Sequence, residues 1–389
     1  MIYLTFTNGY SGVFRSQVLD TAEFLRARFR VDVRVVSIVS IRDFIRERDR
    51  LRKASARVTL LPMFPGVRNW RRNAHMLSVL ARQWDDRTIL GRSEFATALG
   101  VDLRSRGVVD RVGFDGRSAR TAESSEYDSA RKPSFSPEEI FRIERLSVLE
   151  SDYRLAVSEQ LVRYWREEFD YRGSAHVVIP CTLPARLEGL RSPMTRESLG
   201  LSPDQIVLVY SGSAAAWQSL DLMDRFVCEQ MSADRRVVLL LLSEVESNQL
   251  EVGRRYADRV VQRWLPPEQV AAALRVADHG LLLREPSRTN AVSCPTKFAE
   301  YLDAGLGAII SEGVGDLSRF VRDRDCGTVV ESPDVPVELA RPSVVRRRRH
   351  MQLARDYFSK SAHEASYESL LENLGVLDPE AVNRLGGER

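Results

Sequence analysis

The residues best suited to chemistry in this sequence lie where a helix is predicted to begin. Pro295 fits the first position of that helix and Gly305 its C-terminal stop. Lys297 and Glu300 are three residues apart, so they share one face at the N-terminal turn. The Lys297 ammonium adds to the helix dipole and the unpaired N–H groups, which together attract a diphosphate. A carboxylate one turn later can accept hydrogen bonds from two hydroxyls, as a ribose offers. The alternative is that Lys297 and Glu300 are a solvated surface pair.

Two glycine-containing turns are predicted to follow strands. The turn at residues 210–218 contains Gly212 and Ser213, small residues that let the backbone approach a phosphate. The turn at residues 8–16 contains Gly9 and Gly12, and we select Gly12 as the glycine that brings the backbone near a ligand. Many tight turns between a strand and a helix look the same, so an ordinary turn remains an open interpretation for both.

The elements that must position these residues alternate between strand and helix. Apolar runs separated by amphipathic stretches predict repeated βαβ units and parallel sheets. Residues 180–193 interrupt the alternation with three prolines and a glycine, the composition of a linker. The sequence therefore predicts an α/β protein with two tandem Rossmann-like, doubly wound sheets that face each other across a cleft. The predicted strands are 2–7, 31–36, 58–61, 88–90, 109–114, 154–157 and 177–179, then 206–210, 237–242, 259–262, 280–283, 308–311 and 328–330.

The predicted domains are residues 1–185, residues 195–345 and a helical tail, 346–389, expected to pack back toward the first domain. The polar stretch 117–137 is predicted to be a mobile loop on the first domain. In such sheets ligands bind outside the carboxyl ends of the strands, near the point where the strand order reverses. The loops that follow strands are therefore where the functional residues are expected.

Composition and charge exclude several classes of protein. The chain has 389 residues, and its 57 basic and 54 acidic residues give a net charge of +3, with the two signs intermixed. The length and the hydrophobic content of 43% exclude disorder and collagen, and the intermixed charges argue against nucleic-acid binding, which gathers basic residues on one face. The four cysteines form no CxxC motif, so no metal site is predicted. No apolar run reaches the ~18 residues that a spanning helix needs, and we expect a soluble, cytoplasmic, unsecreted protein.

One concentrated basic run stands out from this mixture. It is a solvated helix start or, alternatively, a peripheral contact with the inner face of an anionic membrane. The run consists of Arg346, Arg347, Arg348 and Arg349.

The string from Pro295 to Ile309, preceded by Arg284 and followed by Gly313, resembles the donor-binding segment of glycosyltransferase family 4 enzymes with the GT-B fold. The turn at 210–218 is similar to the glycine turn that opens their second domain, and residues 152–159 and the tail are similar too. The resemblance covers most of the chain, densely in 206–316 and sparsely before 150. It implies transfer of a sugar from a nucleotide diphosphate to an acceptor, with no further cofactor.

The resemblance also implies roles for individual residues. Glu300 corresponds to the residue that binds the donor ribose, and Lys297 and Arg284 correspond to residues at the diphosphate. Gly212 and Ser213 correspond to backbone contacts with the phosphates. The sequence departs from the family pattern at Val292, where a second glutamate is usual, and at residues 215–218, where an arginine and a lysine are usual.

Four residues in the first half of the chain are candidates for the acceptor side. Arg92 and Arg117 could bind an anionic acceptor or the donor diphosphate, and Asp115 or Glu123 could orient an acceptor hydroxyl. Structural ion pairs, Asp115 with Arg117 or Arg92 with Glu94, are an equally open interpretation.

The resulting hypothesis is a hexosyl or related glycosyltransferase that acts with retention of anomeric configuration in polysaccharide or glycoconjugate biosynthesis. Its partners would be a nucleotide sugar, held between the two domains, and a saccharide, lipid-linked or small-molecule acceptor. Two alternatives are a nucleotide-sugar epimerase or hydrolase of the same fold, and a non-catalytic binding subunit. Val292 and the missing Arg/Lys pair favour the latter.

Overall fold

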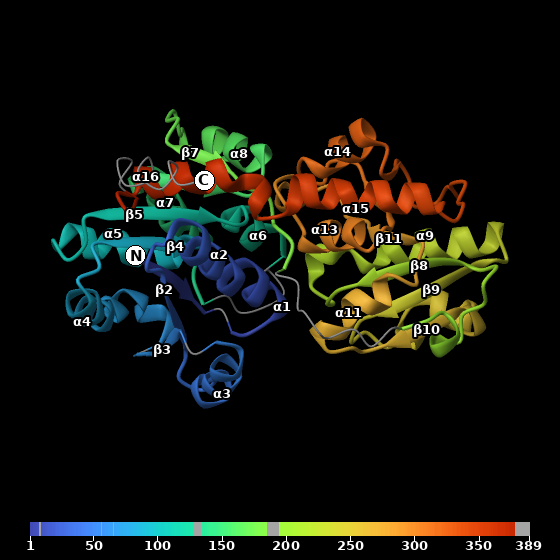
Figure 1. The fold of residues 1–389 in the computed structure, drawn as a ribbon, viewed down its shortest axis with the longest axis horizontal. Coiled ribbons are helices and arrows are strands. Elements are labelled where there is room, and N and C mark those ends of the chain that lie inside the picture. The colour runs from blue at the N-terminus through green and yellow to red at the C-terminus, as the bar shows by residue number, and fades with distance from the viewer. Residues whose placement is uncertain (8, 56, 65, 128–133, 185–193, 378–389) are drawn as a thin grey trace, which may run out of the picture. The chain divides into compact units, whose positions relative to one another are not determined.

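The computed structural model describes the chain except for residues 8, 56, 65, 128–133, 185–193 and 378–389. Two compact units form, and each is seen in Figure 1. The first unit consists of Met1–Pro184 together with His363–Arg389, and the second consists of Ala185–Ala362.

The first unit is built on a seven-stranded parallel sheet with the order β3-β2-β1-β4-β5-β6-β7. Strand β1 pairs with β2 on one side and with β4 on the other, so the strand order reverses between β1 and β4. That reversal is the place where a ligand is expected. The strands are β1 (Ile2–Phe6), β2 (Arg34–Ser40), β3 (Val58–Met63), β4 (Thr88–Arg92), β5 (Arg111–Gly116), β6 (Tyr153–Ala156) and β7 (His176–Val178).

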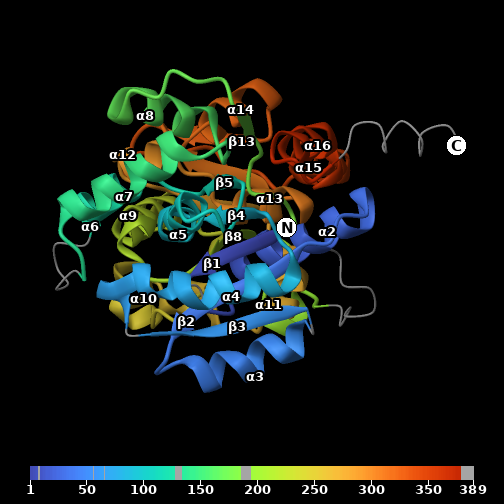
Figure 2. The ribbon, with the colours of Figure 1, turned by 90° about the vertical axis from the view of Figure 1, so that its left-hand side faces the viewer.

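Helices cover both faces of this sheet because successive side chains of a strand point to opposite faces. Ile2, Leu4 and Phe6 of β1 belong to one hydrophobic cluster with α4 and α5, whereas Tyr3 belongs to another with α2 and α16. Figure 2 shows α2 and α4 on opposite sides of β1. The helices are α1 (Gly12–Phe14), a π-helical turn (Arg15–Leu19), α2 (Asp20–Phe29), α3 (Phe44–Ala54), α4 (Ala74–Trp84), α5 (Glu94–Ser105), α6 (Arg120–Tyr127), α7 (Pro137–Glu150), α8 (Glu159–Phe169) and α16 (Glu364–Asn373).

The second unit contains a six-stranded parallel sheet with the order β10-β9-β8-β11-β12-β13, which reverses between β8 and β11. Its strands are fully apolar where both faces are covered, as in β9, whose six residues are all buried. The prediction of an α/β protein with two doubly wound, Rossmann-like sheets is confirmed. The strands are β8 (Ile206–Ser211), β9 (Val237–Leu242), β10 (Val260–Arg263), β11 (His279–Leu282), β12 (Gly307–Ser311) and β13 (Gly327–Val330).

Helix α13 (Thr296–Asp303) ends in a turn that requires glycine. Gly305 has φ +80°, and its N–H donates to Leu302 O at 2.9 Å while Leu306 N–H donates to Tyr301 O at 2.9 Å. This fixes the predicted C-terminal stop. The other helices of the unit are η5 (Ala216–Gln218), α9 (Leu220–Ala233), α10 (Glu251–Arg255), α11 (Pro267–Leu274), α12 (Arg288–Ala291), α14 (Leu317–Arg324) and α15 (Val344–Phe358). Within the described ranges, no helix is both long enough and apolar enough to cross a bilayer.

Two segments differ from the sequence-based expectation. The predicted loop 117–137 contains helix α6, because Glu144 of α7 accepts hydrogen bonds from the first backbone N–H groups of α6, at 3.1 Å from Arg120 and 2.7 Å from Thr121; residues 128–133 lie outside the described chain. The predicted tail divides between the units. Helix α15 belongs to the second unit, and α16, red in Figure 1, packs on β6 and β7 of the first.

Candidate functional site

Lys297 lies in the first turn of α13 and points at the glycine turn that follows β8. Pro295 is the N-cap and not the first helical residue. Although it carries an ammonium group, Lys297 is only 8 % exposed. Its Nζ donates to Gln218 Oε1 at 2.8 Å and lies 4.6 Å from the centroid of the Tyr210 ring. The interpretation of Lys297 as part of a solvated surface pair is therefore wrong.

The absence of a side chain at Gly212 makes room for this ammonium. A Cβ at Gly212 would lie 2.6 Å from Lys297 Nζ, closer than the two atoms can approach. The Tyr210 hydroxyl donates to Ser213 O at 2.9 Å and so helps to fix the turn. Gly212 and Ser213, both predicted to bind phosphate, thus lie in the turn that Lys297 reaches.

Arg284 approaches the same turn from the end of β11. It is 4 % exposed, its backbone N–H donates to Ser311 Oγ at 2.9 Å, and its guanidinium donates to Trp217 O. Two cationic side chains from different elements therefore converge on one glycine turn at the carboxyl edge of the second sheet.

Burial and neighbouring charges shift the pKa values of Lys297 and Glu300. The pKa of Lys297 is lowered well below its ordinary value, first by burial and then by the positive charge of Arg284, and Glu300 opposes this shift. Burial raises the pKa of the half-buried Glu300, and Lys297 opposes that shift. An anion bound beside Lys297 would stabilise its charged form. The chemistry that this arrangement can perform is therefore the binding of an anionic group.

In the first unit, Asp115 at the end of β5 is fully buried and gathers three donors. It accepts hydrogen bonds from the Tyr3 hydroxyl at 2.5 Å and Arg92 Nη1 at 3.2 Å. Arg117 contacts both carboxylate oxygens, at 2.6 Å through Nε and 3.0 Å through Nη2. The structure therefore contains the Asp115–Arg117 pair, and Arg92 pairs with Asp115 and not with Glu94. Asp115 supports two arginines.

A pocket of about 420 Å³ opens at the carboxyl ends of β1, β4 and β5, and we name it the arginine pocket. An adjoining cavity of about 750 Å³ shares Thr7 and Gly9 with it. The arginine pocket is lined by Thr7, Gly9, Ser11, Arg92, Ser93 and Arg117, among others.

Gly12 and Glu123, two of the predicted site residues, are not among the residues that line the arginine pocket. Gly12 begins α1, and a Cβ there would meet no atom within 4 Å. Gly9 lines the arginine pocket, whereas Gly12 is not among its lining residues. Glu123 lies in α6 and pairs with Arg120 at 3.2 Å.

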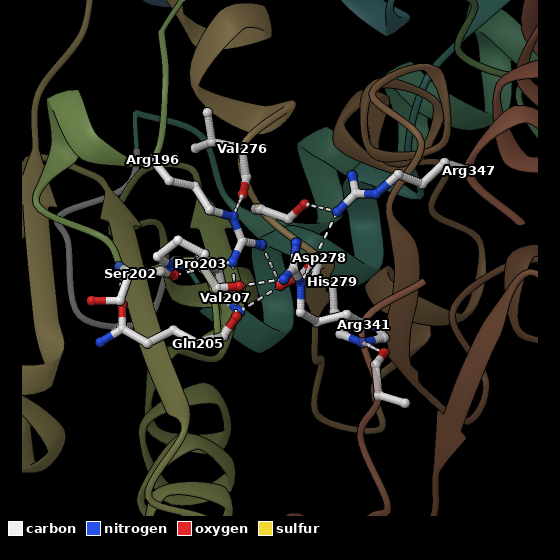
Figure 3. Close-up of polar contacts among 12 residues, drawn as sticks. Arg196, Ser202, Pro203, Gln205, Val207, Val276, Asp278, His279, Arg341 and Arg347 are labelled. Atoms are coloured by element: carbon white, nitrogen blue, oxygen red, sulfur yellow. Dashed lines mark hydrogen bonds and ion pairs between the residues drawn. The ribbon is translucent and has the colours of Figure 1, made fainter. Parts of the chain in front are cut away.

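The basic run at the start of α15 makes ion pairs within the second unit. Figure 3 shows Arg347 beside the fully buried Asp278, whose carboxylate it contacts at 2.7 Å while Arg196 contacts it at 2.6 Å. Arg346 and Arg349 both pair with Asp325, at 3.2 and 3.4 Å. Arg347 thus holds α15 to Asp278 beside the sheet, and Arg346 and Arg349 hold it to the C-terminal end of α14, which favours a structural role for these three arginines over membrane contact.

Sequence reasoning missed several residues of these two sites. Gln218 is the direct partner of Lys297, yet in the sequence it marked only a departure from a basic pattern. Its position at the end of a glycine turn was the available signal. Tyr3 gave no signal, because it reaches Asp115 only through the pairing of strands in the sheet.

Comparisons with known proteins give structural likeness only. No protein-family model matches the chain, and no curated protein sequence matches it. Sucrose-phosphate synthase from Thermosynechococcus elongatus has a TM-score of 0.68 at 14% identity, over 96% of this chain and 99% of the other. A glycosyltransferase from Rickettsia africae has 0.65 at 12%, over 95% and 98%. Anabaena HepE, solved in complex with UDP, has 0.67 at 12%, over 95% and 99%. At these identities the likeness shows the two-domain GT-B fold.

Proposed function

We propose that this chain is a glycosyltransferase of the family 4 type, which transfers a hexosyl or related group from a nucleoside diphosphate donor to an acceptor hydroxyl with retention. The observation that carries the proposal is the buried Lys297 at the start of α13, directed with Arg284 at the Gly212 turn. The resemblance of residues 295–309 to the family's donor segment supports it. So does the fold shared with a glycosyltransferase and with a protein solved with UDP.

In this proposal the second unit binds the donor. Lys297 and Arg284 stabilise the charge that develops on the departing diphosphate, and the backbone of Gly212 and Ser213 donates to its phosphates. A preorganised donor at a developing oxyanion is worth roughly 3–4 kcal/mol, or about 10²–10³ in kcat. Glu300, one turn further along α13, accepts hydrogen bonds from the ribose hydroxyls.

The first unit binds the acceptor. The arginine pocket lies where β1, β4 and β5 end, the edge at which ligands of such sheets bind. Gly12 at the start of α1 leaves open space for a substrate to approach the backbone. The acceptor class is a saccharide, a lipid-linked sugar or a small molecule, in polysaccharide or glycoconjugate biosynthesis.

Because the sequence lacks charged residues that the family usually has near the donor, the proposed leaving-group role falls on fewer side chains. Val292 is 4 % exposed and apolar, so it cannot supply the contact made by a second glutamate. Gln218 is neutral and engages Lys297 directly. Stabilisation of the leaving group therefore rests on Lys297 and Arg284, and replacing either should be severe.

The experiment is a turnover assay of the full chain with UDP-, GDP- and ADP-sugars, with and without sugar acceptors, followed by NMR of the products. Lys297→Ala and Glu300→Ala should abolish turnover and weaken nucleotide binding with little change in Tm. Lys53→Ala, an exposed lysine in the first unit, is the matched control and should behave as wild type. Unaltered activity in both site variants would reject the proposal.

The same assay separates the alternatives. Rapid conversion of the donor without an acceptor would identify an epimerase or hydrolase. Failure of every nucleoside diphosphate to bind would identify a binding subunit that has lost the chemistry.

A further inference from the structure

The arginine pocket contains a guanidinium group that is buried but only partly engaged. Arg92 is 6 % exposed and lines the pocket. A guanidinium carries five N–H donors, and within the described chain Arg92 donates one hydrogen bond, from Nη1 to Asp115. Its remaining N–H groups are therefore available to a ligand in the pocket.

The charges of the group formed by Asp115, Arg92 and Arg117 do not balance, whereas the nearby buried carboxylate of Glu47 is paired with Arg46 and Arg50. Asp115 contributes one negative charge, whereas Arg92 and Arg117 contribute two positive charges. Tyr3 stays neutral, since burial and the neighbouring carboxylate raise its pKa. A net positive charge held away from water is costly unless it is paired, so an anionic ligand would find a complementary site.

The backbone at the pocket wall is held in an unusual conformation. Ser93 has φ 69° and ψ 173°, a region that side-chain-bearing residues rarely adopt and that costs about 1–3 kcal/mol. It is fixed by its N–H donating to Asp115 O at 3.0 Å and by Thr97 Oγ1 donating to Ser93 O at 2.8 Å. Ser93 is also the N-cap of the 12-residue helix α5, whose positive end therefore begins at the pocket.

We propose that the arginine pocket binds an anionic group, phosphate or carboxylate, on the acceptor. Arg92 and Arg117 contact the oxyanion, Asp115 positions both guanidinium groups, and the first turn of α5 adds to the positive field. The adjoining 750 Å³ cavity takes the rest of the molecule. That the bound anion is the acceptor rests on the proposed function, whereas binding of an anion in the arginine pocket does not.

The test measures anion binding by calorimetry in the full chain carrying Lys297→Ala, so that Lys297 cannot contribute. The probes are glucose 6-phosphate, glucuronate, inorganic phosphate and neutral glucose. We expect at least one anion to bind in this background and to bind at least tenfold more tightly than glucose. Glucose 6-phosphate and glucuronate distinguish phosphate from carboxylate as the preferred group. Equal binding of glucose and the anions, or no binding of any anion at millimolar concentration, would overturn the proposal.

Substitutions then locate the site. Arg117→Gln should weaken anion binding at least tenfold, and Arg117→Lys should restore part of it because the charge is kept. Arg87→Gln removes an exposed arginine that pairs with Asp110 on the same unit and should change nothing. Retention of full affinity in Arg117→Gln would contradict the proposal.

A second measurement needs no variant of the pocket. In the wild-type protein, glucose 6-phosphate or glucuronate should slow hydrogen exchange in residues 91–97 and 115–121. Protection confined to residues 211–219 and 295–301 would place the anion at the candidate donor site and overturn the inference. Because these segments belong to different units, failure here is distinguishable from failure of the proposed donor site.

Discussion

Lys297 lies where a charged side chain is costly, and this gives nucleotide binding a predicted pH dependence. Burial and Arg284 lower its pKa, and a bound diphosphate would raise it again. Binding should therefore take up a proton, and affinity should fall as pH rises through the pKa of the free protein. Calorimetry in two buffers of different ionisation enthalpy measures this uptake, in a pH series above pH 7.5 where the nucleotide phosphates, with pKa about 6, are already ionised.

Lys297→Ala is the control for that measurement, because it removes the group that titrates. Residual binding by this variant should show no proton uptake anywhere in that pH series. Equal uptake in the variant and the wild type would assign the proton to another group.

The space at Gly212 predicts that a single added methyl group affects binding more than stability. In Gly212→Ala the new Cβ would displace the flexible end of Lys297, whose Nζ lies 2.6 Å from that position. We expect a Tm close to that of the wild type and nucleotide affinity reduced about tenfold, the loss of roughly 1.4 kcal/mol. Lys53→Ala, which changes an exposed side chain away from both candidate sites, is the control. Unchanged nucleotide affinity in Gly212→Ala would show that nucleotide binding does not depend on the Lys297 ammonium lying beside Gly212.

At the residue scale the sequence predicted which side chains would lie together better than it predicted their direct partners. Lys297 and Gly212 were selected from local pattern and Arg284 from the family resemblance, and the structure brings all three to one turn. The Lys297–Gln218 contact joins residues 79 positions apart in sequence. Such a contact follows from which strands are neighbours in the sheet, and local spacing carries no information on it.

At the scale of elements, helix α16 completes the core of the first unit. Leu371 is fully buried in a hydrophobic cluster with Leu90 of β4, Leu155 of β6 and Ile179, which directly follows β7. Leu371→Ala should lower the free energy of unfolding by about 2–5 kcal/mol, measured by urea denaturation. Val345→Ala on α15, where the side chain is 75 % exposed, should change it by less than about 0.5 kcal/mol. Similar stabilities for the two variants would mean that α16 does not contribute to the core.

The start of α6 depends on a buried carboxyl group, which links its stability to pH. Burial raises the pKa of Glu144 to about 8 against the opposing hydrogen bonds from Thr121. The folded state therefore binds this proton more tightly than the unfolded state, whose value is about 4.5. The stabilisation of the folded state by the protonated Glu144 is fully present below about pH 4.5 and is lost as pH rises through about 8.

Glu144→Gln tests this linkage because the amide keeps the shape of the protonated acid. The Tm of the variant relative to wild type should increase between pH 5 and pH 9, measured by thermal denaturation. A difference in Tm that stays constant over this range would show that Glu144 does not titrate there.

The strands were predictable and the assignment of helices to units was not. Apolar runs bounded by turns located every strand of both sheets within a few residues, as at β9, because buried parallel strands are continuously apolar. Helix α6 was missed because Glu144, a residue of the next helix, caps it. The division of the tail between α15 and α16 depends on which sheet each apolar face covers, and periodicity shows only that a face exists.

At the scale of the whole molecule, each sheet carries one candidate site at its carboxyl edge. The second sheet presents Lys297 and Arg284 at the Gly212 turn, and the first presents Arg92 and Arg117 in the arginine pocket. In the proposed reaction the site of Lys297 and Arg284 would hold the nucleoside diphosphate that leaves, and the arginine pocket would hold the anionic acceptor that receives the sugar.

The most direct test of the central claim is a calorimetric titration of UDP, GDP and ADP into the full chain. At least one of them should bind the wild type and the Lys53→Ala control equally. Lys297→Ala should bind it about 10 to 100 times more weakly, as expected for loss of a charged hydrogen bond worth about 1.5–3 kcal/mol. Equal affinity in Lys297→Ala and wild type would contradict the claim that Lys297, in the first turn of α13, binds the diphosphate.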